Sequence, residues 1–226
     1  NKCKHRIALV TDSTSDLPTR LLEDHQVHMV PLNLHFGEEQ YLDKLSLKPG
    51  QFFRLIDERP HFPTTSQPNE TLFHDLYSFL AQYYDSVISL HISSKFSGTW
   101  QNSMNAARKV SESAGKKISV IDSRNVSGSL GLITLRIARA IESGESHDQI
   151  VSSVEKWIPK TRIFVSVKNL KYMIRGGRVS RSRGYLAGMM NVKPIVSMAP
   201  DGSSQLFDKA FSQKGNMRKV MKHTRE

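Results

Sequence analysis

Cysteine is nearly absent from this sequence, since Cys3 is the single one among 226 residues. One cysteine cannot form an internal disulfide, and such scarcity is typical of proteins in a reducing compartment. Long apolar runs are missing as well, because no stretch approaches the roughly 18 residues of a membrane-spanning helix. The basic start NKCKHRIALVTDS has an apolar run too short for a secretory signal. We therefore expect a cytoplasmic protein.

The sequence also lacks the common catalytic motifs. It contains no Walker loop, G-x-G-x-x-G, H-E-x-x-H or G-x-S-x-G. DSTSD (12–16) begins like the loop of aspartate-nucleophile phosphotransferases, but its second acid follows four residues on and no later Lys–Asp set is evident. The nine histidines show no spacing typical of metal ligands. We expect a binding protein without catalytic residues, metal or cofactor, rather than an enzyme.

Acidic residues are few, with 21 against 32 basic ones, so the net charge is +11. The basic residues gather in RGGRVSRSR (175–183) and in KGNMRKVMKHTRE (214–226). Two explanations account equally well for this distribution of basic residues: a solvated basic surface with a basic tail, or a basic patch that faces an anion. Nucleic-acid binding is the least favoured reading, because aromatic residues do not alternate with the basic ones and no recognition motif is present.

What the sequence does contain is an alternation of short apolar runs and amphipathic stretches up to about residue 160. This alternation predicts an α/β domain with a mainly parallel sheet. In the helix after Pro68 we expect Leu72, Leu76, Phe79 and Leu80 on the buried face. The expected strands cover 7–10, 27–36, 87–90, 117–122 and 162–167, and the expected helices cover 48–57, a stretch from about 98, 128–143 and 147–157.

The composition of the sequence changes after Pro159. Glycine becomes frequent, and two strand candidates flank an Asp-Gly turn in KPIVSMAPDGSSQLFDKA (193–210). We place a domain boundary near residue 160. Residues 1–160 then form the parallel-sheet domain, and 161–226 form a smaller α/β (α+β) domain that looks incomplete at its C-terminus.

Three turns rich in hydroxyl groups stand out in the first domain: DSTSD (12–16), TTSQP (64–68) and SSKFSGT (93–99). Loops at the carboxyl ends of parallel strands gather at one edge of the sheet, where ligands bind. A helix that starts near Gly98 would add free N–H groups for an anion. The same residues are common helix caps, however: Asp16 or Ser15 could cap a helix at Pro18, and Ser97 could face its own helix. Together the turns predict a polar pocket for a carboxylate or phosphate.

The motifs VTDSTSDLP, VPLNL, TTSQP, ISSKFSGTWQNS, VIDSRNVSGSLG and KNLKYMIRGGRVSR, in this order, resemble the DegV family of bacterial fatty-acid-binding proteins. The resemblance runs from about residue 6 to about residue 210. It implies a two-domain α/β protein that holds one long-chain fatty acid, such as palmitate, in a buried tunnel between the domains. It places Thr65 and Ser97 on the carboxylate, with Ser13, Ser94 and Gly98 as neighbours.

The resemblance also suggests which residues line the tunnel around the acyl chain. It suggests a protein partner as well. Ordinary core packing explains each wall residue equally well. Family members serve as the lipid-presenting subunit of a bacterial fatty acid kinase, whose ATP-binding subunit phosphorylates the carboxylate. Arg178 would then lie near the carboxylate end, and its planar guanidinium suits a phosphate. The expected wall residues are Phe96, Ile174, Leu186, Met189, Met190 and Ile195.

Two departures from the family pattern bear on these expectations. Family members continue for about sixty further residues, and this sequence starts at Asn1 rather than Met, which suggests a fragment. Phe211 stands where many members carry an arginine, which puts phosphate handling with a kinase in doubt. Two rivals therefore stay open beside the lipid carrier: an enzyme that acts on a small anionic substrate at the same polar edge, and a basic nucleic-acid-binding module.

Overall fold

The computed structural model describes residues 6–167, 170–178 and 192–225. The chain divides into two compact units, Asn1–Thr161 and Arg162–Glu226. The first unit is built on a four-stranded parallel sheet in the order β2-β1-β6-β7. The expected α/β fold with a parallel sheet is therefore confirmed. The strands are β1 (Ile7–Asp12), β2 (Val27–Val30), β6 (Ser86–His91) and β7 (Lys117–Asp122).

The central strands β1 and β6 are buried along their whole length. Their continuous apolar runs are typical of parallel strands that are covered on both faces. The expected single strand over 27–36 is instead two strands, because Pro31 interrupts it and has no N–H for a ladder. Its first half is β2 in the main sheet, and its second half is β3 (Asn33–Phe36) in a separate small sheet.

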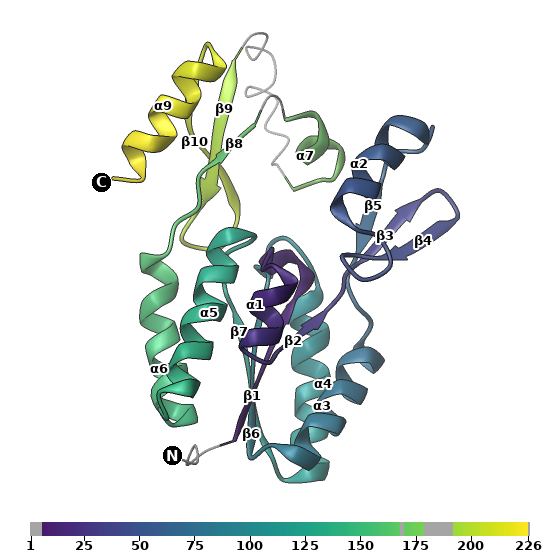
Figure 1. The fold of residues 1–226 in the computed structure, drawn as a ribbon, viewed down its shortest axis with the longest axis vertical. Coiled ribbons are helices and arrows are strands. Elements are labelled where there is room, and N and C mark those ends of the chain that lie inside the picture. The colour runs from purple at the N-terminus through teal and green to yellow at the C-terminus, as the bar shows by residue number, and fades with distance from the viewer. Residues whose placement is uncertain (1–5, 168–169, 179–191, 226) are drawn as a thin grey trace. The chain divides into compact units, whose positions relative to one another are not determined.

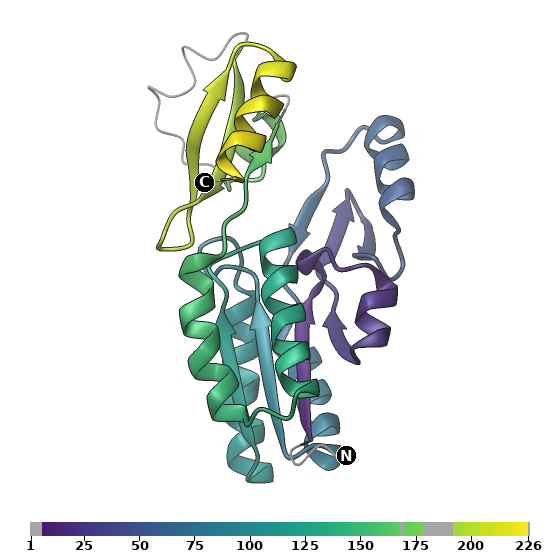
Figure 2. The ribbon, with the colours of Figure 1, turned by 60° about the vertical axis from the view of Figure 1, so that its left-hand side comes forward.

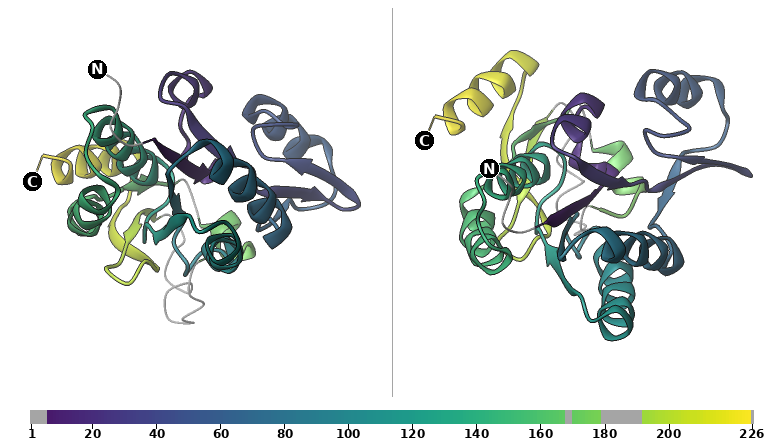
Figure 3. Two further views of the ribbon diagram at one scale, coloured as in Figure 1. Left: turned by 90° about the horizontal axis from the view of Figure 1, so that it is seen from below. Right: turned by 60° about the horizontal axis from the view of Figure 1, so that its bottom comes forward.

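Helices cover both faces of the main sheet (Figures 1 and 3). One apolar core lies under α1 (Thr19–Asp24), α5 (Gly128–Glu142) and α6 (His147–Trp157), where Leu22, Ile133 and Ile150 are buried. A second core lies under α3 (Glu70–Tyr83) and α4 (Thr99–Ala114). The first unit is thus a sheet between two layers of helices, and its loops collect at the ends of the strands.

The buried face of α3 differs from the expected one. Leu80 is buried as expected, but Leu72 and Phe79 are 40% and 53% exposed. The residues that fill the core are Phe73 and Tyr77, both 0% exposed. A tyrosine can occupy such a position when its hydroxyl finds a hydrogen-bond partner, which an apolar stripe read from the sequence does not reveal.

A small antiparallel sheet lies beside the main one in the first unit (Figure 2). Its order is β4-β3-β5, with β4 at Glu39–Leu42 and β5 at Thr64–Ser66. Helix α2 (Pro49–Glu58) covers one face around a core of Leu34, Phe36 and Leu47. Strand β4 was not expected, because its polar sequence EQYL is only partly buried and gives no apolar run.

The DSTSD turn forms a short 3₁₀ turn, Ser13–Ser15, and does not cap the next helix. Asp16 has φ +53°, a left-handed conformation that ends the 3₁₀ turn and differs from the extended one of an N-cap, and α1 begins at Thr19 without a side-chain cap. The expectation that Asp16 or Ser15 caps this helix is therefore wrong. The turn is held instead by Asp12, by Ser127 N, which donates to Thr14 O over 2.8 Å, and by contact with α5.

The second unit is a three-stranded antiparallel sheet in the order β10-β9-β8. The predicted hairpin around Asp201 and Gly202 is confirmed, with Ala199 N donating to Ser203 O over 2.8 Å. The expected strand over 162–167 is reduced to β8. No helix within the described residues is long and apolar enough to cross a membrane. The elements are η2 (Ile158–Lys160) at the end of the first unit, then β8 (Val165–Ser166), α7 (Lys171–Arg175), β9 (Lys193–Met198), β10 (Ser204–Ala210) and α9 (Gln213–His223).

The expected basic tail is largely the helix α9. Ser212 accepts from Gly215 N over 3.0 Å and caps its start. Lys219 Nζ and His223 Nε2 lie 2.8 and 3.0 Å from the carboxylate of Asp208 on β10, and hydrogen bonds from both hold the pKa of that carboxyl well below its usual range. These hydrogen bonds to Asp208 anchor the basic helix α9 on β10.

Replacing Gly131 with alanine tests how closely α5 packs on the DSTSD turn. A Cβ there would lie 2.5 Å from Ser15 O and 3.1 Å from a methyl group of Leu17. We expect a loss of about 1–3 kcal/mol in unfolding free energy, although glycine to alanine normally stabilises a helix. Urea unfolding followed by fluorescence of Trp100 and Trp157 measures it. Gly128→Ala, with open space around its Cβ, is the matched control; equal stability of the two variants would contradict the packing account.

Candidate functional site

Two of the hydroxyl-rich turns leave the main sheet at the point where its strand order reverses. The chain runs outward from β1 to β2 on one side and through β6 to β7 on the other. In open α/β sheets, ligands bind outside the carboxyl ends of the strands at this switch point. DSTSD (12–16) follows β1, and SSKFSGT (93–99) follows β6, so both loops leave neighbouring strands there (Figures 1 and 2).

A single carboxylate joins these two loops. Asp12 Oδ1 accepts from Thr14 N over 3.0 Å and from the Thr14 hydroxyl over 2.5 Å. Asp12 Oδ2 accepts from Ile92 N over 2.9 Å and lies 3.1 Å from His91 Nδ1. Asp12 and His91 are both 0% exposed. The start of each loop is therefore fixed by the same buried group.

The TTSQP segment packs against the start of α4. The Nε2 atom of Gln67 lies 2.7 Å from the position that a Cβ of Gly98 would take, so the Gln67 side chain would have to move to make room for any larger residue. Asn102 Nδ2 donates to Pro68 O over 2.8 Å. Thr65 lies on β5 opposite Leu34, and its side chain is exposed. The structure thus brings the segments that carry Thr65 and Ser97 into contact.

The first turn of α4 combines side-chain and backbone donors. Ser97 Oγ accepts from Thr99 N over 3.3 Å and lies 2.8 Å from Thr99 Oγ1. A hydroxyl accepts two hydrogen bonds and donates one, so Ser97 keeps its proton for a ligand when Thr99 is the donor. Trp100 N and Gln101 N have no acceptor among the described residues, as is usual in the first turn of a helix. Such a set suits an anion.

Ser13 and Ser94 occupy different surroundings. The Ser13 hydroxyl is fully buried, accepts from Leu32 N over 3.1 Å and hydrogen bonds to Asp43. Burial raises the pKa of the Asp43 carboxyl. The Ser94 side chain is exposed, and its N–H donates to Asp122 Oδ1 over 3.2 Å. The hydroxyl of Ser13 therefore holds the loop after β2 in place, whereas that of Ser94 faces solvent.

The remaining residues expected at the site lie in several places. Phe96 is half-buried and packs against the core under α5. Arg178 belongs to the second unit, where its exposed guanidinium donates to Gly176 O over 2.5 Å and its own carbonyl accepts from the Ser204 hydroxyl. In that unit Ile195 is fully buried in β9, Ile174 is half-buried in α7, and Phe211 is 79% exposed. Leu186, Met189 and Met190 lie outside the described residues.

A buried Ser–His–Asp arrangement was missed by the sequence analysis. Ser89 Oγ lies 2.7 Å from His91 Nε2, and His91 Nδ1 lies 3.1 Å from Asp12 Oδ2. The connectivity is that of a serine hydrolase triad. All three residues are 0% exposed, however, and Ser89 accepts from the Tyr77 hydroxyl over 2.7 Å. Ser89 therefore lies inside the core, where no substrate reaches it. A buried polar alternation in SVISLH (86–91) is the one sequence signal that could have found it.

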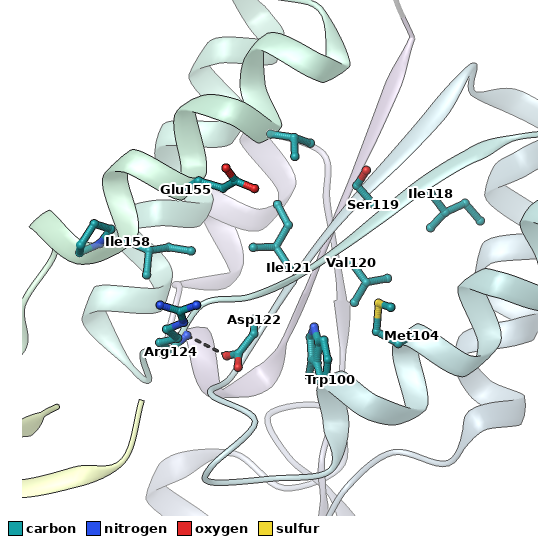
Figure 4. Close-up of a pocket in the computed structure, with 12 residues that line it drawn as sticks. Trp100, Met104, Ile118, Ser119, Val120, Ile121, Asp122, Arg124, Glu155 and Ile158 are labelled. Atoms are coloured by element: carbon teal, nitrogen blue, oxygen red, sulfur yellow. Dashed lines mark hydrogen bonds between the residues drawn. The ribbon is translucent and has the colours of Figure 1, made fainter. Parts of the chain in front are cut away.

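A groove of about 650 Å³ runs along the edge strand β7 of the first unit (Figure 4). Side chains of β7 form its floor, with Trp100 and Met104 of α4 on one side and Glu155 of α6 on the other. Arg124 N donates to Asp122 Oδ1 over 2.8 Å at one end. The groove adjoins the loop after β6, because Trp100 and Asp122 line it and Asp122 accepts from Ser94 N, but none of the side chains expected to hold a carboxylate lines it.

Comparison with known proteins gives consistent relatives. A sequence model of the DegV family, described as "Uncharacterised protein, DegV family", matches residues 6–226. A DegV domain-containing protein of Caldanaerobacter subterraneus is 36% identical over 216 residues, which are 96% of this chain and 75% of the relative.

Two solved structures have the same fold. DegV of Bacillus subtilis, described as a fatty acid binding protein, has a TM-score of 0.89 at 31% identity, over 98% of this chain and 77% of that one. A stearic acid-binding protein of Eubacterium ventriosum has a TM-score of 0.87 at 30% identity, over 97% and 75% of the two chains. With a family match over residues 6–226 and relatives above 30% identity across most of its length, this chain belongs to the DegV family.

Proposed function

We propose that this protein binds one long-chain fatty acid and holds its carboxylate with the hydroxyls of Thr65 and Ser97 at the start of α4. The observation that carries this proposal is the contact between TTSQP and SGT at the N-terminus of that helix, through Gln67 and Gly98. Hydroxyl and backbone N–H donors on a helix N-terminus form a site for a carboxylate without a metal or a nucleophile. The fatty-acid binding described for the two related structures supports it.

In this proposal the acyl chain lies in an apolar tunnel. A chain of sixteen carbons gains on the order of 10 kcal/mol on burial, at about 0.8 kcal/mol for each methylene, before the cost of binding. Phe96, Ile174 and Ile195 are the proposed wall residues within the described part of the chain. Phe96 suits this role because it lies in the ligand loop directly before Ser97 and is only half-buried.

The proposed partner is the ATP-binding subunit of a fatty acid kinase. A carboxylate oxygen would attack the γ-phosphorus of ATP, the bond from that phosphorus to the bridging oxygen would break, and acyl phosphate and ADP would result. Arg178 supports this role, because its guanidinium is exposed on the second unit and a planar guanidinium suits a phosphate. The protein itself would supply the bound lipid and no catalytic residue.

An enzyme that acts on a small anion at the same edge is the second candidate, and the buried Ser89–His91–Asp12 arrangement is the observation that raises it. Its complete burial argues for the carrier. Within the described residues, no group of three or more His, Cys, Asp and Glu side chains could hold a metal ion.

Alanine substitutions at the two hydroxyls test the carboxylate site. We expect Thr65→Ala and Ser97→Ala each to weaken oleate binding by about ten- to a hundredfold, because a hydrogen bond to a charged group contributes about 1.5–3 kcal/mol. Titration calorimetry on delipidated protein gives the dissociation constants.

Matched controls exist on the same segments. Thr64→Ala changes the neighbouring residue of β5, whose side chain points to the opposite face of the strand, and Ser94→Ala changes an exposed serine of the same loop. Both should bind oleate as the wild type does. Unaltered oleate binding by Thr65→Ala and Ser97→Ala would contradict the proposed site, and turnover of a small anion lost in Thr65→Ala would favour the enzyme.

A further inference from the structure

A continuous chain of hydrogen bonds crosses the core of the first unit beneath the carboxylate site. We refer to Asp12, Tyr77, Ser89, His91 and Ser103 as the Asp12 network. Tyr77 OH lies 2.5 Å from Ser103 Oγ and donates to Ser89 Oγ over 2.7 Å. Ser89 Oγ lies 2.7 Å from His91 Nε2, and His91 Nδ1 lies 3.1 Å from Asp12 Oδ2. All five residues are 0% exposed.

The hydrogen bonds of the network run in one direction. The carboxylate of Asp12 only accepts, so His91 donates from Nδ1 and, as a neutral imidazole, accepts at Nε2 from Ser89, which itself accepts from Tyr77. Ser103 in turn donates to the oxygen of Tyr77. Burial raises the pKa of Tyr77 to about 12, which keeps its hydroxyl a donor at neutral pH. Asp12 is the final acceptor, and it also accepts hydrogen bonds from Thr14 N, the Thr14 hydroxyl and Ile92 N.

The members of the network lie on four elements that adjoin the hydroxyl turns, namely β1, β6, α3 and α4. Asp12 fixes the first residues of both DSTSD (12–16) and the loop that leads to SGT. Tyr77 lies on α3, the helix that follows TTSQP, and Ser103 lies one turn into α4, the helix that follows SGT. The bond between Tyr77 and Ser103 therefore links the two helices that carry the segments of Thr65 and Ser97.

Stability alone does not account for such a network. Apolar side chains of similar volume often stabilise a core as well as a buried polar set does. A fully satisfied network instead imposes one arrangement on the groups that it joins, and any unpaired member would be costly. Because the five residues are completely buried, they act on a ligand only through the loops that they hold.

We propose that the Asp12 network positions the carboxylate site, setting the mutual placement of Ser97 and Thr65 so that both hydroxyls reach one carboxylate. Its members are positioning residues, and the inference rests on the proposed fatty-acid function. The network should therefore matter for the charged end of the lipid and not for the acyl chain. That distinction separates positioning from a general structural role.

The test compares two ligands on three variants of delipidated protein. Tyr77→Phe removes one hydroxyl and keeps the ring, Asp12→Asn replaces the final acceptor, and Tyr84→Phe is the matched control, a half-buried tyrosine at the end of α3. Dissociation constants are measured for oleate and for oleyl alcohol, which has the same chain without the carboxylate. Circular dichroism confirms that each variant is folded, and Tyr77→Phe suffices if Asp12→Asn does not fold.

We expect Tyr77→Phe and Asp12→Asn to weaken oleate binding by about tenfold or more, the effect of misplacing one hydrogen bond to a charged group. Binding of oleyl alcohol should change by less than about twofold, and Tyr84→Phe should bind both ligands as the wild type does. Equal losses for oleate and oleyl alcohol, or no loss for either, would overturn the positioning role. A wild-type protein that binds no oleate would instead overturn the proposed function itself.

Discussion

The placement of the polar edge depends on the buried carboxylate of Asp12. A carboxylate removed from water needs hydrogen bonds to both oxygens, and here four donors supply them. Two come from the turn after β1 and two from the end of β6, so satisfying one group fixes two loops. Gly131 then lets α5 approach the first loop, and Gly98 lets Gln67 approach the second. Close backbone packing thus supports the geometry that the carboxylate sets.

This arrangement favours binding over chemistry. The hydroxyls and backbone N–H groups at the edge can receive an anion and release it again without a covalent step. The groups that could form a nucleophilic set, Ser89 and His91, are enclosed in the core and occupied by one another and by Tyr77. On the proposed function, a fold that is widely used for enzymes would serve as a carrier, because Ser89 and His91 lie below the edge and the hydroxyl and N–H donors lie at it.

Much of the fold could be predicted because its signals are local. Short apolar runs correctly predict the strands at 87–90 and 117–122. Amphipathic stretches correctly predict the helices near 128–143 and 147–157. Non-local features could not be read in this way. The buried face of α3 carries Tyr77 and Phe73, where the sequence predicted Leu72 and Phe79. The basic C-terminal sequence forms α9, in which Lys219 donates to Asp208 of β10. The hydrogen bond from Ile92 N to Asp12 joins residues 80 positions apart, so no local pattern marks it.

Native mass spectrometry of the purified protein, followed by organic extraction, tests the central claim most directly. The account predicts a mass increase that corresponds to one fatty acid per chain, with release of a C16 or C18 acid on extraction. It also predicts that protein stripped of this lipid takes up one equivalent of added palmitate or oleate. A protein that carries no lipid and binds neither acid would contradict the account.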